Sequence, residues 1–497
     1  MAVSSSSSAV PENVPSSAAV ARPATPVEID VSCSSPLLLL FASATIWLAI
    51  GLLFQLIASI KLHSPGFFAD TAWMSFGRIR PAGMDALLYG FASQAAIGLI
   101  IWLTCRLGAV MLCCQTPIIV AAAFWNLGVT IGVLAVLSGG STGFTWLEMP
   151  AFASVILFSS YAVIGLCVLA TFYGRAERRL YVSNWYLLAA MFWFPWILSA
   201  GNLLLIYWPV RGVLQAFINT WFTNNFLTLW LGSVALATLF YFIPKLVNRP
   251  LYSLHIAGFG FWTYVFVAGW TGSIQLIGGP LPTWMIAVGS SAALVLIVPT
   301  VAVGLNWYMT VAGTRFDQRA LSDVVLRFIF FGGMAYFVSS IATILLGCYP
   351  VAKVTQFSFV PLAVLYFTIF GFFGMTALGA MYYIIPRASR IAWPSEKLIR
   401  VHYVCSALGI GILFLSLLIG GLIQGYRLNL TAADIVRVSR GAIPFIGLAT
   451  LGFLLLLVGQ IAFLKNLITL LHRQGAPVRR AAVDLFIAEP ARVGGKP

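Results

Sequence analysis

The chain is 497 residues long, and 61% of them are hydrophobic while only 8% are charged. Because an ordinary soluble domain carries about 25% charged residues, this chain cannot cover itself with a water-facing surface, which excludes the soluble globular classes. Apolar runs of about 20 residues recur along nearly its whole length, and each is long enough to cross ~30 Å of hydrocarbon. We therefore predict one all-α polytopic membrane domain.

The formal net charge of +15 would also suit a nucleic-acid-binding protein. Here, however, Lys and Arg stand in short clusters between apolar runs rather than along one amphipathic face, which is typical of positive-inside topology. None of the seven cysteines belongs to a CxxC arrangement, and most lie in or beside apolar runs. The sequence therefore indicates neither nucleic-acid binding, nor a zinc site, nor a disulfide framework.

The ends of the chain differ from the rest in composition. Residues 1–35 are rich in Ser, Ala and Pro, with too few large apolar side chains to offset the entropy of ordering, and we predict a disordered tail. The first apolar run, 36–60, is too long for a signal-peptide core and has no basic region directly before it, so we expect a retained span. The predicted membrane domain is 36–472, and residues 473–497 form a basic C-terminal tail.

Eleven more apolar runs follow, which makes twelve predicted spans. They lie near 82–108, 112–138, 150–173, 183–207, 222–244, 254–275, 281–310, 324–347, 356–386, 400–424 and 441–470. The loops on one side carry most of the cationic clusters, although basic residues also occur in two loops of the opposite side. The positive-inside rule places the richer side in the cytoplasm, and an even number of spans then places both termini there.

Several short motifs between and within these runs resemble one known family. They are FGRIRP at 76–81, VSNWYLLA at 182–189, YFIPK at 241–245, RPLYS at 249–253, FW at 261–262, LPTW at 281–284 and MYYIIPR at 381–387. Together they resemble the catalytic subunit of C-family (cbb-type) heme-copper oxidases, over about residues 36–470. The resemblance implies a twelve-helix subunit I-like fold in a bacterial inner (plasma) membrane. The implied partners are other respiratory-complex subunits, with a c-type cytochrome as one candidate.

In that family six histidines hold a low-spin heme, a high-spin heme and copper, because imidazole is a strong neutral ligand for iron and copper. The four histidines of this chain are His63, His255, His402 and His472. By the resemblance, none of them falls on a ligand position. The vacated heme-ligand positions are Gly83, Val364 and Tyr366, and the vacated copper-ligand positions are Asn224, Ile274 and Gln275. The family's redox-active tyrosine corresponds to Ala292.

Two of the remaining side chains are chemically able to bind heme iron, Tyr366 as a phenolate and Met84 as a thioether. In buried helices both residue types more often serve packing, which we favour here. The polar residues Asn224, Asn225 and Gln275 either line a hydrated pocket or form hydrogen bonds between helices.

Asp85 lies inside the second span, where a carboxylate is a functional suspect. Because Asp85 is near the membrane boundary and near Arg80 in sequence, we favour a structural role, either snorkelling to the boundary or an ion pair with Arg80.

The sequence therefore predicts a cofactor-free protein, without heme or copper, that has a structural, assembly or regulatory role in a respiratory membrane complex. Whether it is an enzyme stays open. The alternative is an active, divergent terminal oxidase subunit that couples electron transfer to oxygen with proton translocation, either through unusual heme ligands or through cofactors on partner subunits. A third possibility is a channel or transporter for a small solute.

Overall fold

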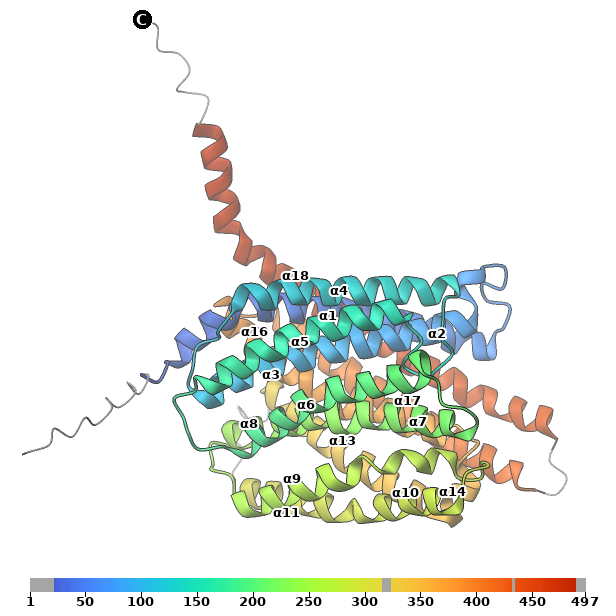
Figure 1. The fold of residues 1–497 in the computed structure, drawn as a ribbon. Coiled ribbons are helices and arrows are strands. Elements are labelled where there is room, and N and C mark those ends of the chain that lie inside the picture. Colours follow the sequence, from blue (N-terminus) through green and yellow to red (C-terminus); the bar gives the residue numbers. More distant parts are fainter. Residues whose placement is uncertain (1–21, 315–322, 431–433, 489–497) are drawn as a thin grey trace, which may run out of the picture.

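The computed structural model describes residues 22–314, 323–430 and 434–488, with side chains as far as residue 475. These residues are helical, with no strand among them, and the long helices run side by side in one bundle (Figure 1). The predicted all-α architecture is confirmed.

The first nine helices are α1 (Pro26–His63), α2 (Phe76–Asp85), α3 (Ser93–Gly108), α4 (Gln115–Ser138), α5 (Ala151–Tyr173), α6 (Val182–Asn202), α7 (Val213–Asn225), α8 (Ser233–Leu246) and α9 (Leu254–Ala268). The later helices are α10 (Thr283–Val295), α11 (Ile297–Val311), α13 (Val324–Gly347), α14 (Tyr349–Thr355), α15 (Val360–Tyr366), α16 (Met375–Ser389), α17 (Glu396–Leu428) and α18 (Ile435–Ala488). Two short segments are 3₁₀-helical, η1 (Ala72–Met74) and η5 (Thr271–Leu276). Four are π-helical, η2 (Ala86–Ala92), η3 (Leu203–Tyr207), η4 (Phe226–Gly232) and η6 (Phe367–Gly374).

Within the described ranges, eleven continuous helical stretches are long and apolar enough to cross a membrane. The remaining predicted span, 254–275, corresponds to α9, which is only 15 residues long, followed by η5. The structure therefore contains a helical counterpart of every predicted span, with one of them shorter and irregular at its end.

Three of the stretches form the centre of the bundle: Phe76–Gly108, Val213–Leu246 and Val360–Ser389. Of the most apolar 18 residues in each, 100%, 83% and 83% are buried, compared with 33–44% in the other eight stretches. A helix that is apolar all round is stable only when other helices or lipid surround it. These three stretches are therefore enclosed by protein, and the outer helices face the surroundings.

The prediction that residues 1–35 are disordered is wrong for Pro26 onward, because α1 begins there. Thr25 and Glu28 form a capping box that satisfies the free backbone N–H groups at the start of this helix. One turn later, the Asp30 carboxylate accepts a hydrogen bond from the Trp102 indole (2.9 Å) and pairs with Arg106 (3.7 Å). These contacts tie the start of α1 to α3. Residues 1–21 of the predicted tail lie outside the described residues.

Both ends of the described chain lie at the same end of the bundle (Figure 1). The Ser34 hydroxyl near the start of α1 donates to the carbonyl of Ala388 at the end of α16. Asn466, in the last part of α18, bonds the backbone of Ser395 at the start of α17. The backbone of α18 continues as a helix to Ala488, so part of the predicted C-terminal tail is helical. Arg106 belongs to this end because it pairs with Asp30 near the start of α1, and Arg175 does too, because the next residue bonds the Gly108 carbonyl at the end of α3.

Helices α17 and α18 approach each other closely at a pair of glycines. A Cβ atom added to Gly452 would lie 2.9 Å from the backbone oxygen of Gly409 and 2.9 Å from the backbone nitrogen of Leu413. Small residues at such crossings allow the backbones of membrane helices to pack directly against each other. Because the neighbouring atoms belong to the backbone, they cannot move aside without shifting a helix.

We expect Gly452→Ala to destabilise the folded protein by about 1–3 kcal/mol through overpacking. The measurement is thermal or denaturant unfolding in detergent micelles, followed by circular dichroism. Gly447→Ala is the matched control on the same helix, since an added Cβ there meets no atom within 4 Å. It should be neutral or slightly stabilising. Equal stability of the two variants would contradict the close contact.

Candidate functional site

A cavity of about 670 Å³ lies between the three central stretches, α9, α13 and the loop that joins α4 to α5. Its wall includes five of the six positions that the sequence comparison identified as vacated ligand positions: Asn224, Ile274, Gln275, Val364 and Tyr366. These residues come from segments far apart in the chain. The structure thus brings together most of the positions at which the resemblance expects cofactor ligands.

The sixth position, Gly83, is covered by the side chain of Gln55 from α1. A Cβ atom on Gly83 would lie 2.9 Å from Nε2 of Gln55, so there is no room for a larger residue without a shift. The Gln55 amide donates to the carbonyl oxygen of Arg80 (3.0 Å) and accepts from the Tyr366 hydroxyl (3.1 Å). Gln55 thereby links the Tyr366 hydroxyl to the backbone of α2 by hydrogen bonds and covers Gly83 by contact.

At the vacated copper positions, Asn224 forms hydrogen bonds between segments. Its amide donates to the carbonyl of Ala268 (2.9 Å), and its carbonyl oxygen accepts from the Thr271 hydroxyl (2.9 Å). Asn224 lines the cavity as well, so both interpretations of this residue hold. Asn225 is buried outside the cavity wall, whereas Gln275 is exposed at its edge.

Each of the three central stretches contains a π-helical segment directly after a vacated position. η2 begins three residues after Gly83, η4 two residues after Asn224, and η6 immediately after Tyr366. Such turns are rare in proteins and occur frequently at functional sites, because they re-aim side chains locally. The backbone around the cavity therefore has the irregular form that is frequent at functional sites.

Asp85 is completely buried in α2, and its partner is Glu148 rather than Arg80. The predicted ion pair is thus wrong, and helix geometry explains why. Residues five apart on a helix are separated by about 140° around the axis and do not share a face. Both oxygens of Asp85 and one of Glu148 have no hydrogen-bond partner among the described groups, so the two carboxyl groups interact mainly with each other.

Glu148 lies in the loop before α5 and lines the cavity. Burial raises the pKa of Glu148 to about 7, and the nearby Arg80 guanidinium acts in the opposite direction. Two adjacent buried carboxyl groups are not both ionised at low cost, so this pair holds a proton near neutral pH.

The donor atoms around the cavity do not fit the heme and copper that the resemblance implies. No histidine or cysteine of the described chain lines the cavity. The one sulfur atom among its lining residues is that of the Met84 thioether. The buried His402 is bonded to the Tyr382 hydroxyl (2.8 Å), and His63 contacts Thr450 (3.2 Å). Among the described residues, no cluster of three or more His, Cys, Asp or Glu side chains has the geometry of a metal site.

The sequence reasoning missed Gln55 and Glu148. Gln55 carries a usable signal, since a polar residue in the middle of a long apolar run must find a partner inside the protein. Glu148 carries none, because an acidic residue in a loop between spans is ordinarily solvated. Its role depends on a contact with Asp85 across 63 positions of the sequence.

Comparison with known proteins gives consistent matches over most of the chain. A cytochrome c oxidase subunit 1 homolog of Bradyrhizobium diazoefficiens is 25% identical over 440 residues, which cover 85% of this chain and 80% of the relative. The cbb3-type cytochrome c oxidase subunit CcoN1 of Stutzerimonas stutzeri is 26% identical over 403 residues, covering 78% and 82%.

The fold is similar to that of a heme-copper terminal oxidase dimer solved by cryo-electron microscopy. The TM-score is 0.69 with 14% identity, and the similarity covers 88% of this chain and 84% of that one. The family described as cytochrome c and quinol oxidase polypeptide I matches residues 35–455. Because this match spans most of the sequence, the chain belongs to the subunit I family of the heme-copper oxidases.

Proposed function

We propose that this protein is a cofactor-free member of the oxidase subunit I family, with a structural, assembly or regulatory role in a respiratory membrane complex. The observation that carries the proposal is a selective loss. The helical frame is present, with a π-helical segment in each of the three central stretches, while by the resemblance the positions of all six family histidines hold other residues. Since function depends on the site rather than on the fold, family membership alone does not make this chain an oxidase.

The hydrogen bonds around the cavity support the proposal. The Tyr366 hydroxyl, the most plausible substitute iron ligand, is engaged with Gln55. Gln55 also occupies the space beside Gly83, where a second axial ligand would have to stand. Asn224 uses both ends of its amide on protein partners. These side chains satisfy one another without a metal or a porphyrin.

The relatives support a place in a multi-subunit complex. CcoN1 is by its name a subunit of a cbb3-type cytochrome c oxidase, and we infer that the present chain also binds other membrane subunits of a respiratory complex, with a c-type cytochrome as one candidate partner. We place it in the bacterial inner membrane with both termini in the cytoplasm. Both described ends lie at one end of the bundle, as an even number of spans requires (Figure 1), and the positive-inside rule assigns the side with most of the cationic clusters to the cytoplasm.

The first test is the heme content of the full-length chain, purified in detergent and separated from its partners. We expect near-zero heme per polypeptide by pyridine hemochrome assay, on protein that is helical by circular dichroism. Copper should also be near zero after washing with a chelator that removes copper bound at surface thiols. A catalytic cbb-type subunit I purified in the same way is the positive control.

Stoichiometric heme with a reducible optical spectrum would overturn the cofactor-free proposal and favour the divergent oxidase. In that case Tyr366→Phe and Met84→Leu would identify the ligand, because loss of either axial ligand shifts the optical spectrum of the heme.

A second test uses the pKa of Glu148, which is about 7 in the folded protein and 4.5 as an ordinary value. Between these pH values the folded state binds more protons at Glu148 than the unfolded state does, so the contribution of Glu148 to stability falls as pH rises from about 4.5 to about 7. At ~1.4 kcal/mol per pKa unit the full loss is of the order of 3 kcal/mol. We expect Glu148→Gln to flatten this dependence in unfolding curves recorded from pH 5 to pH 8.

Glu177→Gln is the matched control for this test, because Glu177 is exposed in the next loop. It should keep the wild-type slope. A slope in Glu148→Gln as steep as that of the wild type would contradict the assignment of this titration to Glu148.

A further inference from the structure

Five of the seven cysteines lie toward the end of the bundle at which α1 begins. They are Cys33 on α1, Cys105 on α3, Cys113 and Cys114 in the loop between α3 and α4, and Cys167 on α5. The thiols of Cys33 and Cys105 contact each other, and Cys167 contacts Cys114. Sulfur is therefore concentrated where three helices meet one loop.

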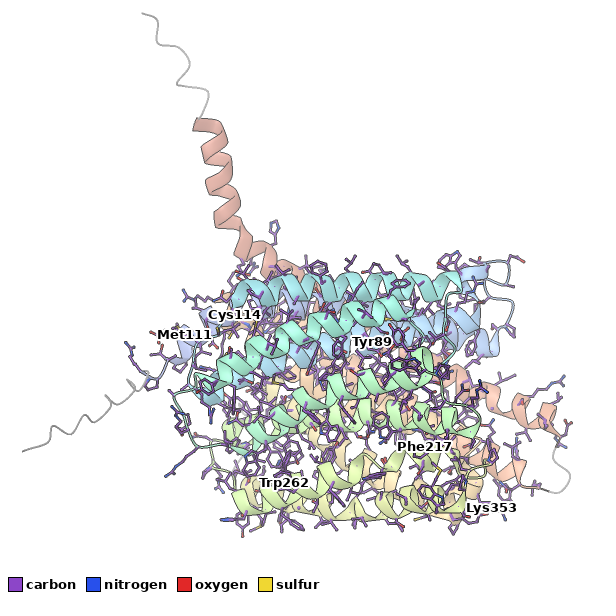
Figure 2. All side chains as sticks on the ribbon, in the orientation of Figure 1. Tyr89, Met111, Cys114, Phe217, Trp262 and Lys353 are labelled. Carbon is purple, nitrogen blue, oxygen red and sulfur yellow. The ribbon has the colours of Figure 1, made fainter. Side chains whose placement is uncertain are left out.

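Within this group Cys113 and Cys114 are exposed, and their sulfur atoms are 2.9 Å apart. Cys167 is buried beside them on α5. The exposed neighbour Met111 lies at the same end (Figure 2).

The loop that carries the pair is held on both sides. The backbone N–H of Leu112 donates to the Ser32 hydroxyl of α1 (3.0 Å), and that of Cys113 donates to the Thr171 hydroxyl of α5 (3.2 Å). On the other side of the loop, the carbonyl of Gly108 accepts from the N–H of Ala176 (2.9 Å). A site whose backbone is already fixed loses little entropy when it binds a ligand.

The compartment decides the oxidation state of the pair. Cys114 is the residue directly before the first turn of α4. This end of the bundle is the cytoplasmic one in the proposed orientation, and cytoplasmic thiols remain reduced. Metal binding therefore explains the pair better than a disulfide.

The number of available ligands limits which metal ion this site can bind. Among the described residues, no three Cys, His, Asp or Glu side chains converge with metal-site geometry, which disfavours the tetrahedral coordination of zinc. Soft thiolates in small number select Cu(I). We propose that Cys113 and Cys114 form a two-thiolate site for Cu(I) at the cytoplasmic end of this protein, with Cys167 adjacent. Two S–Cu bonds form, two thiol protons pass to solvent, and no electron is transferred.

This site is independent of the cavity. Helix α4 separates the two, with Cys114 before its start and the cavity-lining loop after its end, and its 24 residues span about 36 Å. In Figure 2, Cys114 lies at one end of the bundle and Lys353 of α14 at the other. The proposal thus holds or fails separately from the cofactor-free assignment.

The test is an anaerobic titration of the reduced, full-length protein in detergent with Cu(I), in competition with the chromophoric chelator bicinchoninate. We expect the wild type to withdraw one Cu(I) per chain from the chelator and the Cys113→Ser/Cys114→Ser double variant to withdraw none. Cys348→Ser/Cys405→Ser is the matched control and should bind as the wild type does. X-ray absorption of the loaded wild type should show sulfur neighbours alone.

Failure of the wild type to withdraw Cu(I), or equal binding by the Cys113→Ser/Cys114→Ser variant, would overturn the proposal. Because both side chains are exposed, their replacement should leave the fold intact, which size-exclusion chromatography and circular dichroism verify. Copper that persists in the double variant would point to the cavity instead and would count against the cofactor-free function. If the double variant binds no copper, the result supports the Cu(I) site and is compatible with the cofactor-free function.

Discussion

The structure depends on three helical stretches that are enclosed on nearly all sides by other helices. In such a position a polar group that finds no partner within the protein is costly, because lipid cannot supply one. Gln55 shows how this constraint is met. It satisfies the Tyr366 hydroxyl and a backbone carbonyl of α2 while filling the space beside Gly83. A cofactor-binding centre that loses its ligands must be repaired in this way, or the buried polar groups left behind would destabilise the fold by about 1–3 kcal/mol each.

Much of the architecture was predictable, because apolar runs of membrane length are a strong signal. The errors arose where an element deviates from that pattern. The start of α1 contains Glu28, Asp30 and several serines, and its composition resembles a disordered tail. It is ordered because Asp30 pairs with Arg106 and Trp102 of α3, and a contact between distant segments leaves no trace in local composition. The 15-residue α9 is short for a span because η5 continues it in a tighter helical form.

Part of the candidate site was also predictable, from family motifs rather than from the length of apolar runs. The vacated positions follow from motifs that the sequence shares with a family, and the structure places five of them around one cavity. What the motifs did not reveal is the replacement chemistry. Asp85 was correctly singled out as a buried carboxyl group, yet its partner was assigned by proximity in sequence, and on a helix a separation of five residues turns the side chains apart. The π-helical segments were equally inaccessible, since hydrophobic periodicity does not distinguish a single wide turn from regular helix.

Backbone-shaping motifs and metal-ligand positions differ in how closely this chain matches the family, and this difference suggests which parts of the protein are functional. Motifs such as RIRP, IPK and IPR, which shape helix ends and bends, are present in this chain, whereas by the resemblance the positions of the family's imidazole ligands hold other residues. A fold under no constraint would lose both at similar rates, because backbone-shaping prolines and glycines are no more tolerant of substitution in general than buried side chains are. Retention of the frame alone is expected when the outer surface and the loops are what partners recognise. Under the cofactor-free proposal, the parts of the protein in use are its periphery and its ends, and the residues around the cavity need only satisfy one another.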